Sequence, residues 1–254
     1  MKKRIIPSIL LKNGTSTSLS NKFQPWRTTG TLAQQLKLHI SREADELILL
    51  NPFSSLASNP RITQLINKEV DIPITYSGNI NTVEDAENCI KSGFEKVYVS
   101  RLFHRDPEEI NRISNVLGRQ SIGISFEYKW ICLNEDIFPV IWDFENDSAT
   151  DISILTALSR ASDLGVGEIL LYNVDRDGSL SGLDMKILSY LEQSSIELPI
   201  LLAGGAGSET HFADVLKHPL ISGVVAGSVF ALSQCTPSTV RKYCKSLEIS
   251  MRNL

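Results

Sequence analysis

The sequence predicts an α/β protein, a (β/α)8 barrel that forms a single domain over residues 1–254. Three observations lead to this fold. Short apolar segments alternate with helical patterns along the chain, which is typical of parallel strands joined by helices. Eight such segments occur, and 254 residues is a usual length for an eight-stranded barrel. The sequence also resembles itself at an offset of 126 to 127 residues, half of its length, which predicts two fused half-barrels, approximately 1–119 and 120–254.

The predicted strands are apolar runs bounded by turn residues, as expected for strands that are covered on both faces. In chain order they are Ile5–Leu11, Glu46–Asn51, Pro73–Ser77, Lys96–Ser100, Ser121–Glu127, Glu168–Asn173, Pro199–Ala203 and Gly223–Gly227.

Helix signals fall between these strands. Asn81 or Thr82 is the expected N-cap of a helix over Thr82–Ser92, and Asp106 is the expected cap of a helix that starts at Pro107 and ends near Leu117. Further helices are predicted near Asp151–Leu164, Asp184–Glu192 and Ser208–Leu216.

Two connections are longer than an ordinary link between a strand and the helix that follows it. The segment 13–29 is polar and rich in Ser and Thr, and we expect it to be a mobile lid over the active mouth. The segment 128–150 carries several aromatic residues, which predict a small hairpin. Ordinary loop decoration is the alternative for both.

Composition narrows the function. The net charge is −4 and the pI about 5.6, so no basic field attracts nucleic acid or an anionic membrane. The four cysteines form no CxxC pair and the four histidines no cluster, so neither a metal nor a disulfide framework is expected. No apolar run is long enough to span a membrane, and Pro7 and Ser8 interrupt the apolar start, which we interpret as a strand and not a signal peptide. These features predict a cytoplasmic protein.

Two glycine-containing turns predict a phosphate site. Gly204 and Gly205 follow the seventh strand, and Gly227 and Ser228 follow the eighth. Glycines let the backbone approach an anion, and the loops after these two strands are the usual phosphate-binding place in barrels. Tight turns without a ligand are the alternative. A weaker second site is expected at the equivalent place in the first half, where only Gly78 remains and Arg101 adds positive charge.

Several segments, in order and spacing, resemble the cyclase subunit of imidazole glycerol phosphate synthase, a histidine biosynthesis family. The resemblance covers nearly the whole chain and rests on Arg4–Pro7, Ala44–Leu47, Thr82–Ala86, Glu95–Val97, Gly167–Leu171, Asp175–Gly178 and Gly204–Gly207. It implies a half-barrel-duplicated fold and a heterodimer in which a glutaminase docks at the N-terminal face of the barrel and supplies ammonia. It also implies a substrate with two phosphates, and we expect no cofactor.

The resemblance is incomplete at the active mouth. It implies an aspartate at the ends of strands one and five, but Leu10 and Glu127 stand there. Asn51 and Ser100 stand where it implies a carboxylate and an asparagine. Glu127 and Asp177 therefore remain as the catalytic candidates, with a turn-capping role as the alternative for Asp177.

At the opposite end of the barrel the resemblance is complete. Arg4, Glu46, Lys96 and Glu168 match a ring of charged residues that gates ammonia entry in the family. A salt-bridged plug that only stabilises the barrel is the alternative.

We therefore expect a diverged paralogue that takes ammonia from a glutaminase and forms an amidine or amide on a phosphorylated or nucleotide-linked sugar, as in families associated with acetamidino groups of surface polysaccharides. Two alternatives stay open. One is an authentic cyclase of histidine biosynthesis, which Leu10 argues against because a positioned acid or base typically contributes about 10²–10⁴ in rate. The other is a non-catalytic barrel that binds a glutaminase and supplies its ammonia channel.

Overall fold

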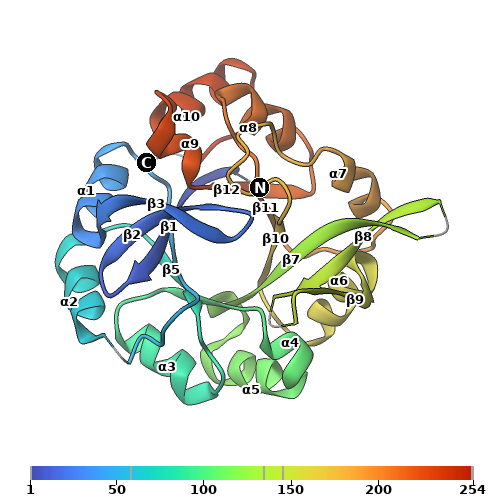
Figure 1. Ribbon diagram of the computed structural model, residues 1–254, viewed down its shortest axis with the longest axis horizontal. Helices are drawn as coiled ribbons and strands as arrows, with labels where there is room; N and C mark the ends of the chain where they lie inside the picture. The colour runs from blue at the N-terminus through green and yellow to red at the C-terminus, as the bar shows by residue number, and fades with distance from the viewer. Residues whose placement is uncertain (1, 58, 134, 145, 253–254) are drawn as a thin grey trace.

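The fold is a closed barrel of parallel strands surrounded by helices, as predicted (Figure 1). The computed structural model describes residues 2–57, 59–133, 135–144 and 146–252. Each barrel strand pairs in parallel with the next, and the last pairs with the first, which closes the barrel. In order around the barrel the strands are β1 (Arg4–Asn13), β4 (Leu47–Asn51), β5 (Ile74–Gly78), β6 (Lys96–Val99), β7 (Ile122–Leu133), β10 (Glu168–Asn173), β11 (Ile200–Ala203) and β12 (Ile221–Ala226).

Local sequence signals place the helices. Thr82 forms a capping box with Asp85 at the start of one helix, and the Asp106 side chain accepts a hydrogen bond from the Glu109 amide at the start of another, so both predicted caps are confirmed. The helix expected from Asp151 begins instead at Ile154, because strand pairing continues to Ser153. The described helices are α1 (Leu32–Ser41), α2 (Pro60–Glu69), α3 (Val83–Lys91), α4 (Leu102–Arg105), α5 (Pro107–Leu117), α6 (Ile154–Asp163), α7 (Lys186–Leu191), α8 (Glu209–Leu216), α9 (Ser228–Leu232) and α10 (Pro237–Ser246).

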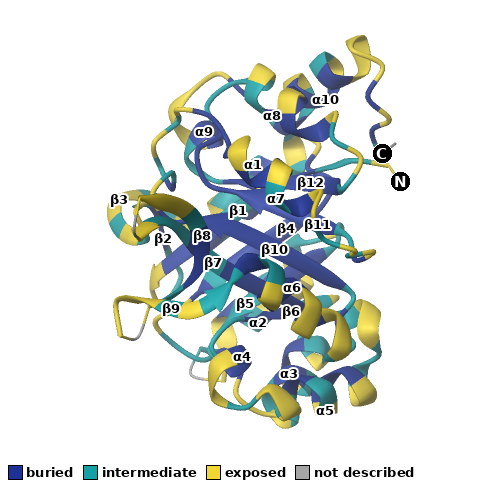
Figure 2. Ribbon diagram, turned by 90° about the vertical axis from the view of Figure 1, so that its right-hand side faces the viewer, coloured by how far each residue is buried: buried dark blue, intermediate teal, exposed yellow. Residues whose placement is uncertain are grey.

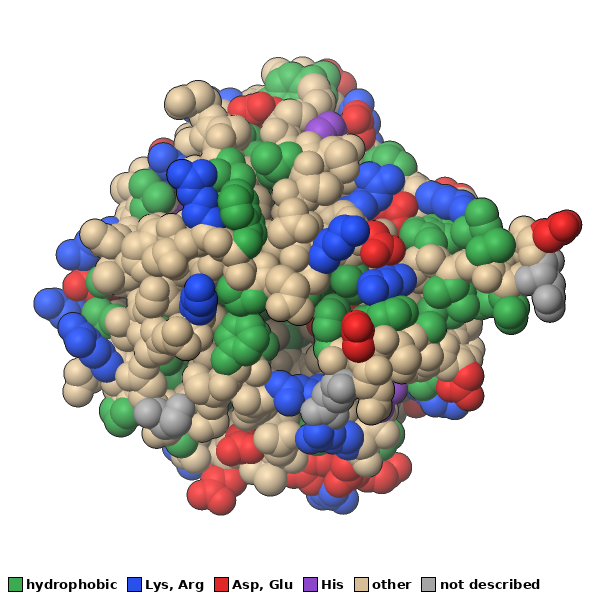
Figure 3. Space-filling model, in the orientation of Figure 1, with side chains coloured by type: hydrophobic (Ala, Val, Ile, Leu, Met, Phe, Trp, Pro, Cys, Tyr) green, Lys and Arg blue, Asp and Glu red, His purple; other side chains and the backbone are tan. Residues whose placement is uncertain are grey.

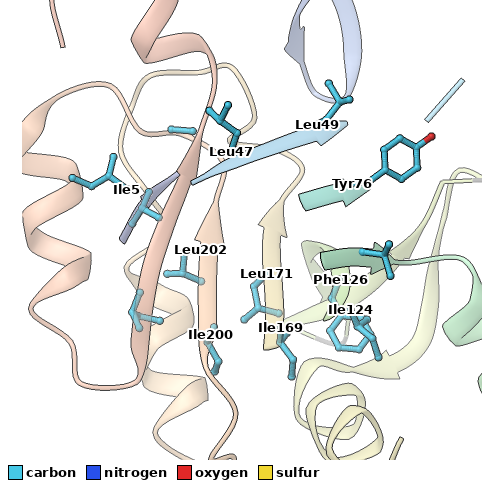
Figure 4. Close-up of a cluster of buried hydrophobic side chains, with 14 of the residues drawn as sticks. Ile5, Leu47, Leu49, Tyr76, Ile124, Phe126, Ile169, Leu171, Ile200 and Leu202 are labelled. Atoms are coloured by element: carbon cyan, nitrogen blue, oxygen red, sulfur yellow. The ribbon is translucent and has the colours of Figure 1, made fainter. Parts of the chain in front are cut away.

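The strands bury two separate sets of apolar side chains because successive residues point to opposite faces. Outward residues such as Ile5, Leu49 and Leu171 pack against the helices (Figure 4). Inward residues such as Ile6, Ile48 and Leu170 form a second cluster inside the barrel. Among the described residues no helix is long and apolar enough to cross a bilayer.

Both long connections form antiparallel sheet at one end of the barrel. The segment expected to be a mobile lid is a hairpin of β2 (Ser16–Asn21) and β3 (Gln24–Thr31), and β2 pairs with the extended end of β1. Its alternating Ser and Thr residues therefore belong to strands and not to a loop. The predicted hairpin in 128–150 is confirmed, since β7 runs on beyond the barrel and pairs with β8 (Asp136–Asp143), which pairs with β9 (Ser148–Ser153). The two chain termini lie at the opposite end (Figure 2).

Candidate active site and charged ring

A cavity of about 370 Å³ opens at the end of the barrel that carries the two hairpins. Its walls come from the C-terminal ends of β1, β4, β5, β6, β7 and β10 and from both hairpin regions. Figure 3 views this end, where the surface is hollowed near its centre and hydrophobic side chains border the hollow. Leu10 lines the cavity, so the position at which an acid was implied faces the mouth and offers only an apolar side chain.

Glu127 supplies a carboxylate to this cavity. The Ser125 hydroxyl donates to its Oε1 at 2.7 Å, and the Ser100 hydroxyl donates to its Oε2. Burial raises the pKa of Glu127, while the two serine hydrogen bonds and Arg101 act in the opposite direction. A carboxyl group whose pKa is raised toward neutrality suits proton transfer. The structure thus brings Glu127 and Ser100 together at the mouth.

Asp177 has a different environment. It is 5% exposed, and both of its carboxylate oxygens already accept hydrogen bonds. The Tyr172 hydroxyl donates to Oδ1 at 2.9 Å, and the Phe23 amide, in the turn of the β2–β3 hairpin, donates to Oδ2 at 2.9 Å. The carbonyl of Asp177 also accepts from the Lys22 amide at 3.2 Å. Asp177 therefore fastens the hairpin to the barrel, whereas neighbouring Asp175 is exposed.

The glycine turns after β11 and β12 line a second, smaller pocket of about 40 Å³. Gly204, Gly205, Gly227 and Ser228 all face it, and Asp177 forms part of its wall. A volume of this size holds roughly three water-sized groups. Packing also requires the first two glycines, because they have φ of +95° and +99° and a Cβ there would lie 2.4 Å and 2.2 Å from neighbouring carbonyl oxygens.

Gly78 and Arg101 line the larger cavity, away from the small pocket. The Arg101 guanidinium donates to the Asn79 side chain and to the Pro52 carbonyl, which holds it at the edge of the cavity.

Asn51 does not line this cavity. Its amide donates to the Tyr76 hydroxyl at 2.9 Å, outside the barrel, and the preceding Leu50 faces the mouth instead.

The four charged residues at the other end of the barrel are in contact. Arg4 donates to both oxygens of Glu46, at 3.0 Å and 3.2 Å, and also to Glu168. Lys96 donates to Glu168 at 2.7 Å. Burial alone would raise the pKa of Glu168, but Arg4 and Lys96 attract its charge and lower it. For Glu46, burial and the nearby Glu168 raise the pKa against the attraction of Arg4.

Sequence reasoning did not identify Tyr98, which lies between this charged ring and the mouth. Its side chain is 1% exposed, packs inside the barrel with Ile6 and Leu170, and donates its hydroxyl to Glu168. Gly123 makes room for it, since a Cβ there would lie 2.0 Å from Tyr98 Cε1. The spacing of two from Lys96 along β6 was the signal that places Tyr98 inside.

A buried carboxylate fixes the base of the β7–β8 hairpin. Asp184 Oδ2 accepts from the Tyr128 hydroxyl at 2.9 Å, the Trp130 indole at 2.6 Å and the Asn173 amide at 2.9 Å. Hydrogen bonds to a carboxylate are strong, so these three contacts fix the orientation of the β7–β8 hairpin relative to the barrel. Among the residues that the structure describes, no group of three or more His, Cys, Asp or Glu side chains is arranged to hold a metal.

Comparison with known proteins gives consistent matches. The model of the histidine biosynthesis protein family matches residues 4–236. Imidazole glycerol phosphate synthase subunit HisF of Chlorobium phaeovibrioides is 30% identical over 253 residues, which cover 98% of each chain. The same subunit of Chlorobium limicola is 29% identical with the same coverage. The putative subunit HisF of Leptospira interrogans is 31% identical over 233 residues, 91% of this chain and 90% of that one.

Proposed function

This chain belongs to the histidine biosynthesis protein family, and we propose that it is the ammonia-accepting synthase subunit of a glutamine amidotransferase complex. In this proposal a glutaminase subunit docks at the N-terminal end of the barrel, forms a heterodimer with the chain and releases ammonia there. The barrel carries the ammonia to the mouth, where it reacts with a phosphorylated small molecule. The names of the relatives, each a subunit of imidazole glycerol phosphate synthase, support a synthase role.

The observation that carries the proposal is the charged ring of Arg4, Glu46, Lys96 and Glu168. Two cations and two anions hold one another at hydrogen-bond distance across the end of the barrel. Buried ion pairs add little stability compared with apolar residues of similar size, so stability alone is a weak reason to keep four of them. A ring of paired side chains can instead part and admit a small neutral molecule such as ammonia.

At the mouth, Glu127 is the residue best suited to proton transfer. Ammonia attacks an electrophilic carbon of the acceptor and forms a C–N bond, and the nitrogen must then lose a proton. Glu127 can take that proton when ionised and return it to a leaving oxygen, with Ser100 and Ser125 holding the carboxylate in place. Asp177 serves the same site indirectly, because its carboxylate holds the Phe23 amide and the Tyr172 hydroxyl and so fixes the β2–β3 hairpin on the barrel.

For the acceptor, we propose an amidine- or amide-forming reaction on a phosphorylated or nucleotide-linked sugar, as for surface polysaccharides. Leu10 is the reason, since an apolar side chain at this place cannot share acid–base work with Glu127. An authentic cyclase of histidine biosynthesis is supported at least as well by the full-length similarity to HisF subunits. A barrel that only conducts ammonia is the third candidate, favoured by the engaged state of Asp177.

The test uses the full chain and the glutaminase subunit encoded nearest to it. Complex formation is measured by light scattering after size exclusion, for the wild type, Glu168→Gln in the ring and Glu87→Gln on an exposed helix face. We expect a 1:1 complex for the wild type and the Glu87 variant and weaker binding or altered glutaminase turnover for the Glu168 variant. If no glutaminase binds the wild type, the proposal is wrong.

Complementation separates the candidates. Growth of a histidine auxotroph that lacks the cyclase, on expression of this chain, identifies an authentic cyclase. If growth fails, glutamine-dependent transfer of ¹⁵N to nucleotide-linked sugars is compared between the wild type and Glu127→Gln in the presence of the glutaminase. Loss of transfer in the variant supports catalysis by this chain, and equal transfer by both supports a conduit that serves another enzyme.

A further inference from the structure

A single layer of side chains separates the charged ring from the larger cavity. Inward residues on a strand are two positions apart, so the residues two beyond the ring members form the next layer. All four are buried in the cluster inside the barrel: Ile6, Ile48, Tyr98 and Leu170. Two positions further on, three of these strands already line the cavity, with Leu50, Ser100 and Tyr172. A small molecule that moves from the ring to the cavity must therefore pass this one layer.

Within the layer, Tyr98 has small neighbours on its side of the barrel. It pairs in register with Gly123 of β7, and a Cβ there would lie 2.0 Å and 2.5 Å from two carbons of the Tyr98 ring. The ring thus occupies the space that a side chain at position 123 would fill. The next inward residues on β6 and β7 are Ser100 and Ser125, and both line the cavity. Displacement of one aromatic ring would therefore connect the two ends of the barrel on this side.

The Tyr98 hydroxyl ties its ring to the charged residues. Gly123 pairs with Glu168 of β10, so the phenol crosses β7 and donates to Glu168 on the following strand. It shares Glu168 Oε2 with Lys96, which donates at 2.7 Å. Burial and the negative charge of Glu168 raise the pKa of Tyr98 well above its ordinary value, so the phenol remains a neutral donor. A buried hydroxyl without an acceptor is unfavourable, so the ring stays in place while Glu168 does.

We propose that Tyr98 is an inner gate between the charged ring and the larger cavity. With the phenol bound to Glu168, its ring closes the β6–β7 side of the layer. When the ring swings off Gly123, a path opens past Ser100 and Ser125 for a small neutral molecule, and the bond to Glu168 couples this movement to the parting of the charged ring. A permanently packed barrel core is the alternative. The role of this gate in ammonia passage rests on the proposed function, but the closure of the barrel by Tyr98 does not.

The test measures how fast a small neutral reagent reaches a thiol placed beside the charged ring. Leu201 is a suitable position, because it is buried in the same cluster and borders Gly223 together with Arg4. Leu201→Cys in the full chain is treated with methyl methanethiolsulfonate, and peptide mass spectrometry follows residue 201 separately from the native cysteines. A buried thiol reacts only when the structure around it opens.

The two variants of Tyr98 separate the ring from its hydroxyl. Tyr98→Ser removes the ring and should raise the rate at residue 201 about 10-fold or more, because a path to the thiol is then permanently open. Tyr98→Phe keeps the ring but loses the bond to Glu168, so it should raise the rate by a smaller factor, about 3-fold to 10-fold.

Two matched controls exclude a general loosening of the fold. Leu202→Cys places the thiol at the next residue, which is also buried but packs against the helices outside the barrel. Its rate should not respond to Tyr98→Ser. Ile48→Ala shortens another side chain of the same layer, on the strand where Leu50 follows, and should change the rate at residue 201 less than about 2-fold. Circular dichroism confirms that each variant is folded.

The gate is rejected if Tyr98→Ser leaves the rate at residue 201 unchanged, if the rates at residues 201 and 202 rise alike, or if Ile48→Ala acts as strongly as Tyr98→Ser. A rate for Tyr98→Phe equal to that of Leu201→Cys alone would reject the coupling to the charged ring. Failure of glutaminase binding with all these rates as expected would reject the proposed function alone.

Discussion

Glu168→Gln removes one charge from the ring at the N-terminal end of the barrel. The Glu168 side chain is 4% exposed and accepts from Arg4, Lys96 and Tyr98. Removing one member of a buried ion pair costs about 3–5 kcal/mol, since the partner stays buried without its counter-charge. Glutamine keeps one oxygen as an acceptor, and Arg4 keeps Glu46 as its ion-pair partner. We therefore expect a loss of stability at the lower end of this range, about 3 kcal/mol.

The measurement is thermal unfolding at pH 7. For a chain of this size about 1 kcal/mol shifts the Tm by roughly 2–4 °C, so Glu168→Gln should lower it by about 6–12 °C. Glu87→Gln is the control. Glu87 forms an exposed i,i+4 pair with Lys91 at 2.8 Å, and such a pair contributes about 0.5 kcal/mol or less.

The pH dependence gives a second check. The folded-state pKa of Glu168 lies below its ordinary value of 4.5, because Arg4 and Lys96 outweigh the effect of burial. The contribution of the ionised Glu168 to the free energy of unfolding is therefore complete above the unfolded-state pKa, and it is lost as the pH falls through the folded-state pKa. The difference in Tm between the wild type and Glu168→Gln should narrow below about pH 4.5. A Tm at pH 7 equal to that of the control, or a difference that stays constant down to pH 3, would refute this reasoning.

Three further substitutions test the interior and the hairpins. Gly123→Ala places a Cβ 2.0 Å from a carbon of the Tyr98 ring, so urea unfolding should show a loss of about 1–3 kcal/mol. The same substitution should cost much less in a Tyr98→Ser background, where the ring is absent, and an equal cost in both backgrounds would contradict the packing. Asp177→Asn should lower stability by about 1–2 kcal/mol and speed proteolysis in the β2–β3 turn, because it weakens two hydrogen bonds to a carboxylate; unchanged cleavage would argue against a fastening role. Asp184→Ala leaves three donors without their acceptor and should lower the free energy of unfolding by about 3 kcal/mol. Relative to the wild type, hydrogen exchange should speed up more at the base of the β7–β8 hairpin than at β11.

Part of this fold could be predicted because its signals are local. Each barrel strand is a short apolar run between turn residues, and Thr82 and Asp106 cap their helices through side chains within one turn. The family resemblance placed Leu10, Glu127 and Ser100 at one mouth, and all three line the same cavity. The family resemblance gave the charged ring, and the structure brings its four members into contact.

The remaining features depend on contacts between segments far apart in the chain. Whether Asp177 is a free acid or a fastener depends on where the β2–β3 hairpin folds, 154 residues away, and the sequence around Asp177 is the same in either case. Asn51 points outward and Leu50 toward the mouth, which the register of β4 in the closed barrel fixes.

The sequence by itself therefore determined the barrel, the positions of its eight strands and the caps of two helices, because periodicity and capping act over a few neighbours. Only the tertiary structure decided what those residues touch: Tyr98 beside Glu168, Asp177 against the Phe23 amide, and Phe23 on Phe144. Such contacts are set by strand register and hairpin packing across the whole chain, which no local pattern encodes.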